Sequence, residues 1–195
     1  MSDAKQIYLV RHGETEWSKN GQHTGLTDIP LTENGIKQAK LLGKRISSLK
    51  FDHVFSSPLK RAFDTCCFCG LKSQAQITDA LLEWNYGDYE GKKSAEIHLS
   101  NPEWNIFKNG APNGESIDDV QKRADEFLQM LNQLDGTIAF FSSGHFSRVF
   151  TVRFLGLPII KGRHFILSTA SLSILSYEHK QPALKLWNDI SHHSH

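Results

Sequence analysis

The sequence predicts a three-layer α/β protein in which helices cover both faces of a mostly parallel central sheet. Short runs of apolar and β-branched residues alternate along the chain with longer segments whose apolar residues recur at helical spacing. The 195 residues are 39% hydrophobic and 22% charged, which is the composition of an ordinary globular protein. Because no internal repeat or linker interrupts this pattern, we expect a single domain over residues 1–195, with a polar tail at about 189–195.

The first half of the chain alternates strands with helices. Ile7–Val10 is a short apolar run that predicts a strand, and a polar, glycine-containing loop follows it as far as Leu31. A helix is predicted next, because Thr32 can cap it and apolar residues then recur at helical spacing. The other expected elements are a strand at 53–56, a helix opened by Ser57 and Pro58, a weak strand at 75–78, and a long excursion with one short helix over 83–113.

The second half repeats the alternation. Ser116 and Asp119 form a capping-box-like start, and the single apolar stripe after them predicts a helix. We expect a buried strand at 137–141, followed by a helix at 146–155 that Gly156 and Pro158 terminate. Two further strands, at 172–177 and 183–187, close the sheet. Strands that alternate with helices in this way favour a mostly parallel sheet.

Composition and charge exclude several classes of protein. The formal net charge of +1 provides no broad surface for nucleic acid or membranes. The start, MSDAKQIYLV, is not that of a secretory signal, and no window approaches the roughly 20 apolar residues that a membrane span needs. Cys66, Cys67 and Cys69 are crowded together, which suits free thiols in a reducing compartment. We therefore expect a cytoplasmic protein with no nucleic-acid or membrane partner, and its oligomeric state is not predicted.

No metal or cofactor is expected. The cysteine spacing matches no zinc pattern, and Glu14, Glu16 and Asp64 form no carboxylate cluster for magnesium. Three histidines lie in the polar tail, namely His192, His193 and His195. Adventitious metal binding by this tail is more plausible than a catalytic site there.

Reactive residues gather where the predicted strands end. Arg11 and His12 follow the first strand, Ser57–Arg61 follows the second, and Ser143–Arg148 follows the strand at 137–141. In open parallel sheets ligands bind at the carboxyl ends of the strands, so these three segments are expected to meet at one rim.

That rim would suit a phosphate ester. Arg11 and Arg61 could fork onto phosphate oxygens, and their positive charge would keep His12 neutral and nucleophilic. Glu83 is a candidate for the acid that protonates the departing alkoxide. Each of these residues could also be structural, because a strand-end Arg-His-Gly alone is a weak signal and most helix arginines are simply solvated. By themselves the residues therefore predict an anion site and little more.

Longer runs of sequence resemble a known family. They are IYLVRHGETEWSKNGQHTGLTDIPLTENGIKQ (7–38), SSPLKRAFDT (56–65), LLEWNYGDYEG (81–91) and NGES (113–116). In this order and spacing they resemble the histidine phosphatase superfamily, whose members have the phosphoglycerate-mutase-like αβα fold. The phrases EWSKNGQHTGLTD, EWNYGDYEG and SYEHKQPALKL are similar to its sedoheptulose-bisphosphatase branch.

The resemblance implies a role for each matching position. His12 would be the phosphorylated nucleophile, Arg11 and Arg61 phosphate ligands, and Glu83 the proton donor to the leaving group and base for the attacking water. Further contacts to the substrate phosphate are implied for Ser18, Thr24, Gly25, Ser143, Gly144 and His145. Ser18 stands where many members have asparagine.

One position departs from the family pattern. The segment FFSSGHFSR (140–148) matches a His-Gly-His-x-x-Arg pattern with Ser143 in place of the first histidine and His145 as the second. Losing one such donor to the phosphoryl group costs about 10²–10³ in rate, by analogy with oxyanion-hole deletions. A natural enzyme of low or altered activity, an introduced substitution, and compensation by an inward-turned His145 are all compatible with the sequence.

The expected function is that of a metal-independent phosphomonoesterase that hydrolyses small-metabolite phosphates, with sugar phosphates as the leading class. A mutase is the alternative enzyme, but the chain is short in the region after Glu83 where mutases of this family carry an insertion. Small protein phosphohistidine phosphatases typically lack the Glu83 segment. The alternative that is not an enzyme is a pseudoenzyme that binds phosphate but turns over poorly, because Ser143 replaces a histidine of the family pattern.

Overall fold

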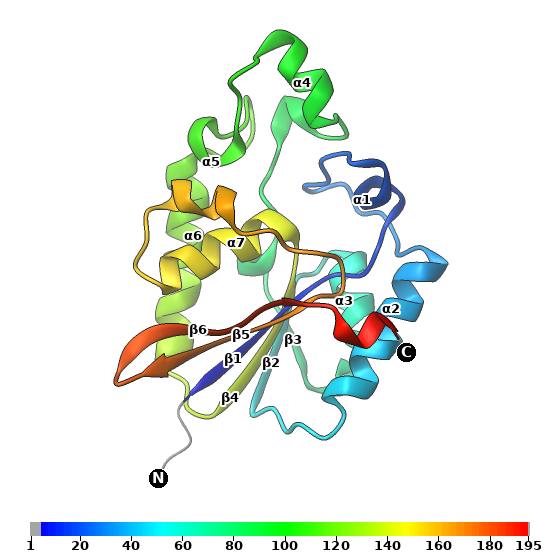
Figure 1. The fold of residues 1–195 in the computed structure, drawn as a ribbon, viewed down its shortest axis with the longest axis vertical. Coiled ribbons are helices and arrows are strands. Elements are labelled where there is room, and N and C mark those ends of the chain that lie inside the picture. Colours follow the sequence, from blue (N-terminus) through cyan, green and yellow to red (C-terminus); the bar gives the residue numbers. More distant parts are fainter. Residues whose placement is uncertain (1–4, 195) are drawn as a thin grey trace.

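One sheet runs through the middle of the molecule, as Figure 1 shows for the computed structural model, which describes residues 5–194. Within that part of the chain its strand order is β3-β2-β4-β1-β5-β6. The strands are β1 (Gln6–Arg11), β2 (His53–Ser56), β3 (Ala75–Ile77), β4 (Thr137–Ser142), β5 (Leu172–Glu178) and β6 (Gln181–Asp189). The first four strands in this order are parallel to one another, whereas β5 pairs antiparallel with both β1 and β6. The predicted α/β class with a mostly parallel sheet is confirmed.

Helices cover both faces of this sheet (Figure 1). They are α2 (Glu33–Ile46) and α3 (Lys60–Phe68) on one face, and α6 (Ile117–Asn132) and α7 (Gly144–Phe154) on the other. Because successive side chains of a strand point to opposite faces, β1 contributes to both cores. Ile7 and Leu9 lie in the core with α6 and α7, whereas Tyr8 and Val10 lie in the core with α2. The central strands are thus buried on both faces, which explains their continuous apolar runs.

The helix starts follow the predicted capping residues. The Thr32 side chain accepts a hydrogen bond from the backbone N–H of Gly35 at the start of α2. Ser116 and Asp119 form the expected capping box at the start of α6. The start of α3 differs from expectation, because Leu59 is its N-cap and Pro58 lies outside the helix. Arg61 is therefore the second residue of α3 rather than a residue one turn inside it.

The sequence pattern predicts one short helix where the excursion has two, and none in the loop before Leu31. The polar loop before Leu31 contains α1 (Glu16–Asn20), and the excursion over 83–113 contains both α4 (Ser94–Ser100) and α5 (Ile106–Asn109). Helices of four to seven residues are too short to show an apolar stripe at 3.6-residue spacing. In Figure 1, α4 and α5 lie above the sheet on the same side as the ends of β1 and β4, opposite α1.

The end of the chain is packed rather than free of the domain. Residues Ser191–Ser194 form a short 3₁₀ turn against α2, and Arg45 of α2 pairs with Asp189. His192 is buried, and its Nε2 lies 2.9 Å from the carbonyl oxygen of Ala170. The tail predicted at about 189–195 is polar in sequence but held by these contacts; His195 lies outside the described residues.

No helix between residues 5 and 194 has both the length and the apolar character that crossing a membrane requires.

Two glycines let α2 touch the loop that follows β1. A Cβ atom added to Gly13 would lie 2.6 Å from the carbonyl oxygen of Gly35, and one added to Gly35 would lie 2.2 Å from that of Glu14. Both contacts are to backbone, which cannot rotate away as a flexible side chain can. The loop that carries His12 is therefore seated directly on the first turn of α2.

Gly35→Ala is expected to lower the free energy of unfolding by about 1–3 kcal/mol, because overpacking of a closed backbone contact forces the chain to move. Urea unfolding followed by circular dichroism measures the loss. Lys37→Ala, on the exposed face of the same helix, is the control and should change stability by less than about 0.5 kcal/mol. A Gly35→Ala protein as stable as the control would contradict the close contact.

Candidate active site

The main chain of His12 joins the ends of two strands to the loop before β5. Its N–H donates to the carbonyl oxygen of Ser142 (2.9 Å), and its carbonyl accepts from the N–H of Ala170 (2.9 Å). Ala170 has a positive φ of 48°, which costs a residue with a side chain roughly 1–2 kcal/mol. The contacts of Ala170 with His12 and His192 hold this conformation.

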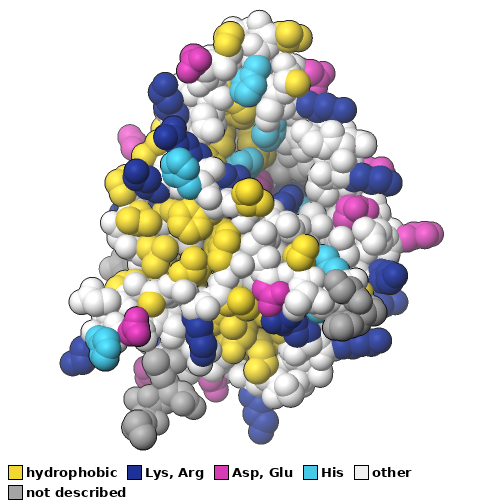
Figure 2. All heavy atoms as spheres, in the orientation of Figure 1, with side chains coloured by type: hydrophobic (Ala, Val, Ile, Leu, Met, Phe, Trp, Pro, Cys, Tyr) yellow, Lys and Arg dark blue, Asp and Glu magenta, His cyan; other side chains and the backbone are white. Residues whose placement is uncertain are grey.

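A pocket of about 170 Å³ opens at this point. Figure 2 shows the surface hollowed near the top of the molecule, with histidine and basic side chains around the hollow. The lining residues are Arg11, His12, Ser18, Gly21, Gln22, His23, Thr24, Glu83, Tyr86, Gly144, His145, Arg148 and Leu167. Most of the predicted site residues are thus brought together, whereas Gly25, Arg61 and Ser143 are not among the lining residues.

His12 is positioned as a neutral imidazole with one free nitrogen. Its side chain is almost fully buried, at 4% exposed, and Nδ1 lies 2.7 Å from the carbonyl oxygen of Gly13. Because a carbonyl can only accept, Nδ1 carries the proton and Nε2 keeps its lone pair. Burial, followed by the charges of Arg61 and Arg11, holds the pKa of His12 well below its ordinary 6.5. The imidazole is therefore neutral at pH 7, with its single proton on Nδ1.

Arg11 lies flat against the glycine that begins α7. A Cβ atom on Gly144 would come within 3.3 Å of the guanidinium carbon, so a larger residue there would press on the arginine. Nη1 donates to the carbonyl oxygen of Leu167, and Nε has no hydrogen-bond partner among residues 5–194. A partly buried guanidinium with an unpaired donor in a pocket wall is suited to receive an anion.

Arg61 instead holds the loop that borders the pocket. It is fully buried, and its two terminal nitrogens donate to the carbonyl oxygens of Thr27 (2.9 Å), Gly25 (2.7 Å) and Thr24 (3.2 Å). Arg61 therefore does not line the pocket, but its charge contributes to lowering the pKa of His12. Its role as a direct phosphate ligand stays a prediction.

The three predicted contacts from the loop before α2 behave differently. Ser18 and Thr24 line the pocket, and the Ser18 hydroxyl donates to the carbonyl of Thr15 (2.9 Å) within the cap of α1. The N–H of Gly25 donates to both carboxylate oxygens of Glu90, at 2.9 and 3.0 Å. A phosphate could take up the Gly25 N–H only by displacing Glu90.

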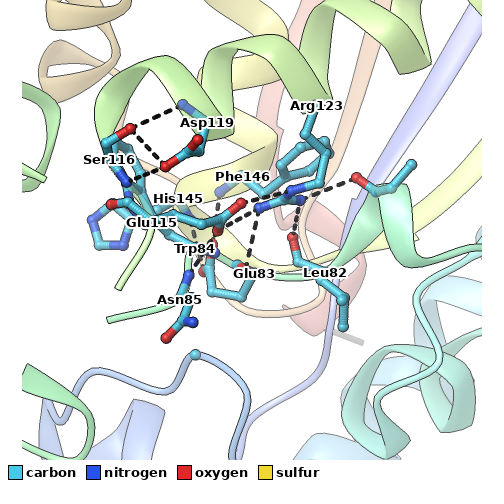
Figure 3. A network of polar contacts seen from close by, with 12 residues as sticks. Leu82, Glu83, Trp84, Asn85, Glu115, Ser116, Asp119, Arg123, His145 and Phe146 are labelled. Atoms are coloured by element: carbon cyan, nitrogen blue, oxygen red, sulfur yellow. Dashed lines mark hydrogen bonds and ion pairs between the residues drawn. The ribbon is translucent and has the colours of Figure 1, made fainter. Parts of the chain in front are cut away.

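Glu83 is held at the start of α7. Its Oε1 accepts from the backbone N–H groups of Trp84 (2.9 Å) and Phe146 (2.7 Å), and its Oε2 accepts from that of His145 (2.9 Å). Figure 3 shows Arg123 between the carboxylate of Glu115 and the backbone around Glu83, which it fixes by donating to the carbonyl oxygens of Leu82, Ala80 and Glu83. The carboxylate reaches the pocket from a rigid frame, as a positioned acid requires.

At the position that departs from the family pattern, the hydroxyl does not reach the pocket. Ser143 is fully buried, and its Oγ has no hydrogen-bond partner within the described chain. The next histidine, His145, does line the pocket, and its Nδ1 is hydrogen-bonded to the hydroxyl of Tyr86. Burial, then the charges of Arg148, His23 and Arg11, hold the pKa of His145 well below 6.5.

Several lining residues were missed by the sequence argument. Tyr86 lies inside the run 81–91 quoted for the family resemblance, so its position was a signal that could have been used. Arg148 ends the Ser143–Arg148 segment expected at the rim, but no role was assigned to it. His23 adjoins the predicted Thr24 and could have been included on the same ground. Leu167 contributes its backbone carbonyl, and no feature of its side chain indicates that contact.

The fold and the pocket define an α/β protein with a neutral histidine beside an arginine that can bind an anion. Comparison with known families agrees with this class, since the profile of the histidine phosphatase superfamily (branch 1) matches residues 7–190. This chain belongs to that superfamily, and we class it as a phosphatase.

Individual relatives cover nearly the whole chain. It is 40% identical to an acid phosphatase of Mycobacterium tuberculosis, over 89% of this chain and 87% of that protein. It is 29% identical to the sedoheptulose 1,7-bisphosphatase of Saccharomyces cerevisiae, over 91% of this chain and 90% of the relative. A solved structure of an open reading frame product from Mycobacterium tuberculosis superimposes with a TM-score of 0.91 at 38% identity, covering 94% of this chain and 97% of that one.

The lowered pKa of His12 predicts how stability changes in acid. A histidine of the unfolded chain takes up a proton below about pH 6.5, whereas the buried His12 does not, so the free energy of unfolding should fall below that pH. The expected slope is up to about 1.4 kcal/mol per pH unit for this residue. Urea unfolding between pH 7 and 5 measures the slope, and His12→Gln should reduce it. NMR titration that places the His12 pKa at 6.5 or above would contradict the assignment.

Proposed function

We propose that this protein is a metal-independent phosphomonoesterase that hydrolyses small-metabolite phosphates through a phosphohistidine on His12. The observation that carries the proposal is the His12 imidazole, neutral, with Nδ1 fixed by Gly13 and Nε2 available in a small polar pocket beside Arg11. The names of the relatives, an acid phosphatase and a sugar bisphosphatase, support a phosphate ester as the substrate.

The reaction proceeds in two displacements at phosphorus. In the first, the His12 Nε2 lone pair forms a P–N bond while the ester P–O bond breaks, and Glu83 in its acid form gives its proton to the departing alkoxide. In the second, Glu83 as the carboxylate takes a proton from water, the water oxygen bonds to phosphorus, and the P–N bond breaks to release inorganic phosphate. Arg11 stabilises the negative charge on the equatorial oxygens, which is the main demand of phosphoryl transfer.

The size of the pocket favours small esters, and sugar phosphates are the class we propose. A cavity of about 170 Å³ accommodates a phosphoryl group and only part of its alcohol. We also propose a cytoplasmic location; the three cysteines are free, and burial raises the pKa of the Cys66 thiol to about 12, so that it stays unreactive. A panel of sugar, amino-acid and aryl phosphates, with and without chelator, tests both substrate class and metal independence. Tight binding without phosphate release across the panel would instead indicate a binding protein.

His12→Ala is expected to abolish turnover and any acid-labile phosphoenzyme while the fold stays intact. The change removes the nucleophile, so quench-flow labelling with a ³²P-labelled ester should trap nothing. His164→Ala removes an exposed imidazole and is the control. Retention of more than about 1% of activity by His12→Ala would contradict the mechanism, since loss of the nucleophile removes several orders of magnitude.

Glu83→Gln is expected to slow alkyl phosphates much more than p-nitrophenyl phosphate, because nitrophenolate leaves without needing a proton. The kcat ratio between the two substrates is the measurement, and Glu126→Gln on the exposed face of α6 is the control. The Glu83 carboxylate also accepts hydrogen bonds from three backbone N–H groups. Circular dichroism must therefore show that the helix content of the variant is unchanged. Equal losses on both substrates in a folded variant would remove Glu83 from the acid role.

A further inference from the structure

The pocket presents a different imidazole from the one that the family pattern provides. Ser143 stands at the usual histidine position, but its Oγ is enclosed and unpartnered within the described chain and does not line the pocket. His145, two residues on in the first turn of α7, lines the pocket together with His12 and Arg11. In Figure 3 its ring points away from Arg123, while its backbone N–H is bound by Glu83.

The hydroxyl of Tyr86 decides which nitrogen of His145 carries the proton. Tyr86 is buried, at 2% exposed, and His145 Nδ1 is the hydrogen-bond partner of its hydroxyl within residues 5–194. If Nδ1 carried the proton, the phenolic O–H would be left without an acceptor, which costs about 1–3 kcal/mol in a buried site. The O–H therefore donates to Nδ1, and the proton of a neutral imidazole must be on Nε2.

The surroundings keep both members of this pair neutral. Burial lowers the pKa of His145, and the groups that face it, the Arg148 guanidinium, the His23 imidazole and the Arg11 guanidinium, lower it further. Its ring also packs on Phe107, with ring centres 5.3 Å apart. Burial, and then the carboxylate of Glu83, raise the pKa of Tyr86 well above 10, so the phenol keeps its proton. Nε2 of His145 makes no hydrogen bond within the described residues, and its proton is free for a ligand in the pocket.

We propose that Tyr86 fixes His145 in its Nε2–H tautomer, and that this N–H is the donor offered to the transferring phosphoryl group in place of an imidazole at residue 143. His145 is then a catalytic residue and Tyr86 a positioning residue that acts through it. The inference rests on the proposed function, because it names the phosphoryl group as the ligand of that N–H.

The tautomer is measured without any turnover. In ¹⁵N-imidazole NMR spectra at pH 7, His145 of the wild type should show a protonated Nε2 and an unprotonated Nδ1. Tyr86→Phe removes only the hydroxyl and should shift His145 toward a mixture of tautomers. Tyr89→Phe is the matched control, because Tyr89 lies on the same segment, packs on Trp104 and does not line the pocket, and it should leave the spectrum unchanged. A protonated Nδ1 or a cationic His145 in the wild type would overturn the proposal.

Binding of orthovanadate, which mimics the five-coordinate phosphoryl group, measures the contribution of the His145 N–H donor. Its Kd should rise by about 10²-fold in His145→Ala and by about tenfold in Tyr86→Phe, comparable with the loss of one oxyanion donor. His145→Gln, whose amide N–H₂ can take the place of Nε2–H, should recover part of the affinity. Adding Tyr86→Phe to His145→Ala should cost nothing more, because the hydroxyl acts only through the imidazole.

Additive effects in the double variant, or unchanged vanadate binding in His145→Ala, would contradict the proposal. The two failures remain distinguishable: a wild type that releases phosphate from no ester contradicts the proposed function, whereas the tautomer and vanadate readouts decide the role of Tyr86 and His145 by themselves.

Discussion

The site depends on the way the backbone of His12 is held. Its N–H is bound by Ser142 at the end of β4, and its carbonyl by Ala170 in the loop before β5. These two bonds place the residue after β1 between neighbouring segments that come from distant parts of the sequence. Gly13 then continues onto α2 and donates its N–H to the Thr65 hydroxyl (2.9 Å), so the loop is fixed on both sides of the imidazole. These backbone contacts fix the position of the His12 imidazole in the pocket.

The second constraint is the burial of positive charge. Arg61 is fully buried and Arg11 partly buried near His12, and the described chain gives neither guanidinium a direct ion pair with a carboxylate. Arg61 donates to three backbone carbonyls and Arg11 to one, and the Nε of each has no hydrogen-bond partner among residues 5–194. Holding these charges out of water without a carboxylate partner costs desolvation energy, and a bound dianion would offset that cost. The same charges explain why a histidine here stays neutral.

Much of the fold and part of the site followed from the sequence for identifiable reasons. The β1 and β4 runs are continuous in apolar residues because both faces of each strand are covered, and capping residues marked the starts of α2 and α6. The strand-end positions of Arg11 and His12, together with the family resemblance, predicted the pocket that these residues line with Glu83. The sequence could not show that Arg61 turns to backbone carbonyls or that Glu90 occupies the Gly25 N–H, because those are choices among partners that folding brings together. Nor could it show that His145 rather than Ser143 reaches the cavity.

The register of the sheet has a consequence for how the protein acquires its binding capacity. β1 begins to pair with β4 at Gln6 and Thr137, so two segments far apart in the sequence must pair before the pocket exists. Such non-local pairing is slow compared with helix formation. A nascent chain that has not yet emerged beyond α6 has neither the Ser142 carbonyl nor the 144–148 turn, and should not sequester phosphate. Phosphate or vanadate would then bind the completed fold alone, and would draw late folding intermediates toward it by mass action.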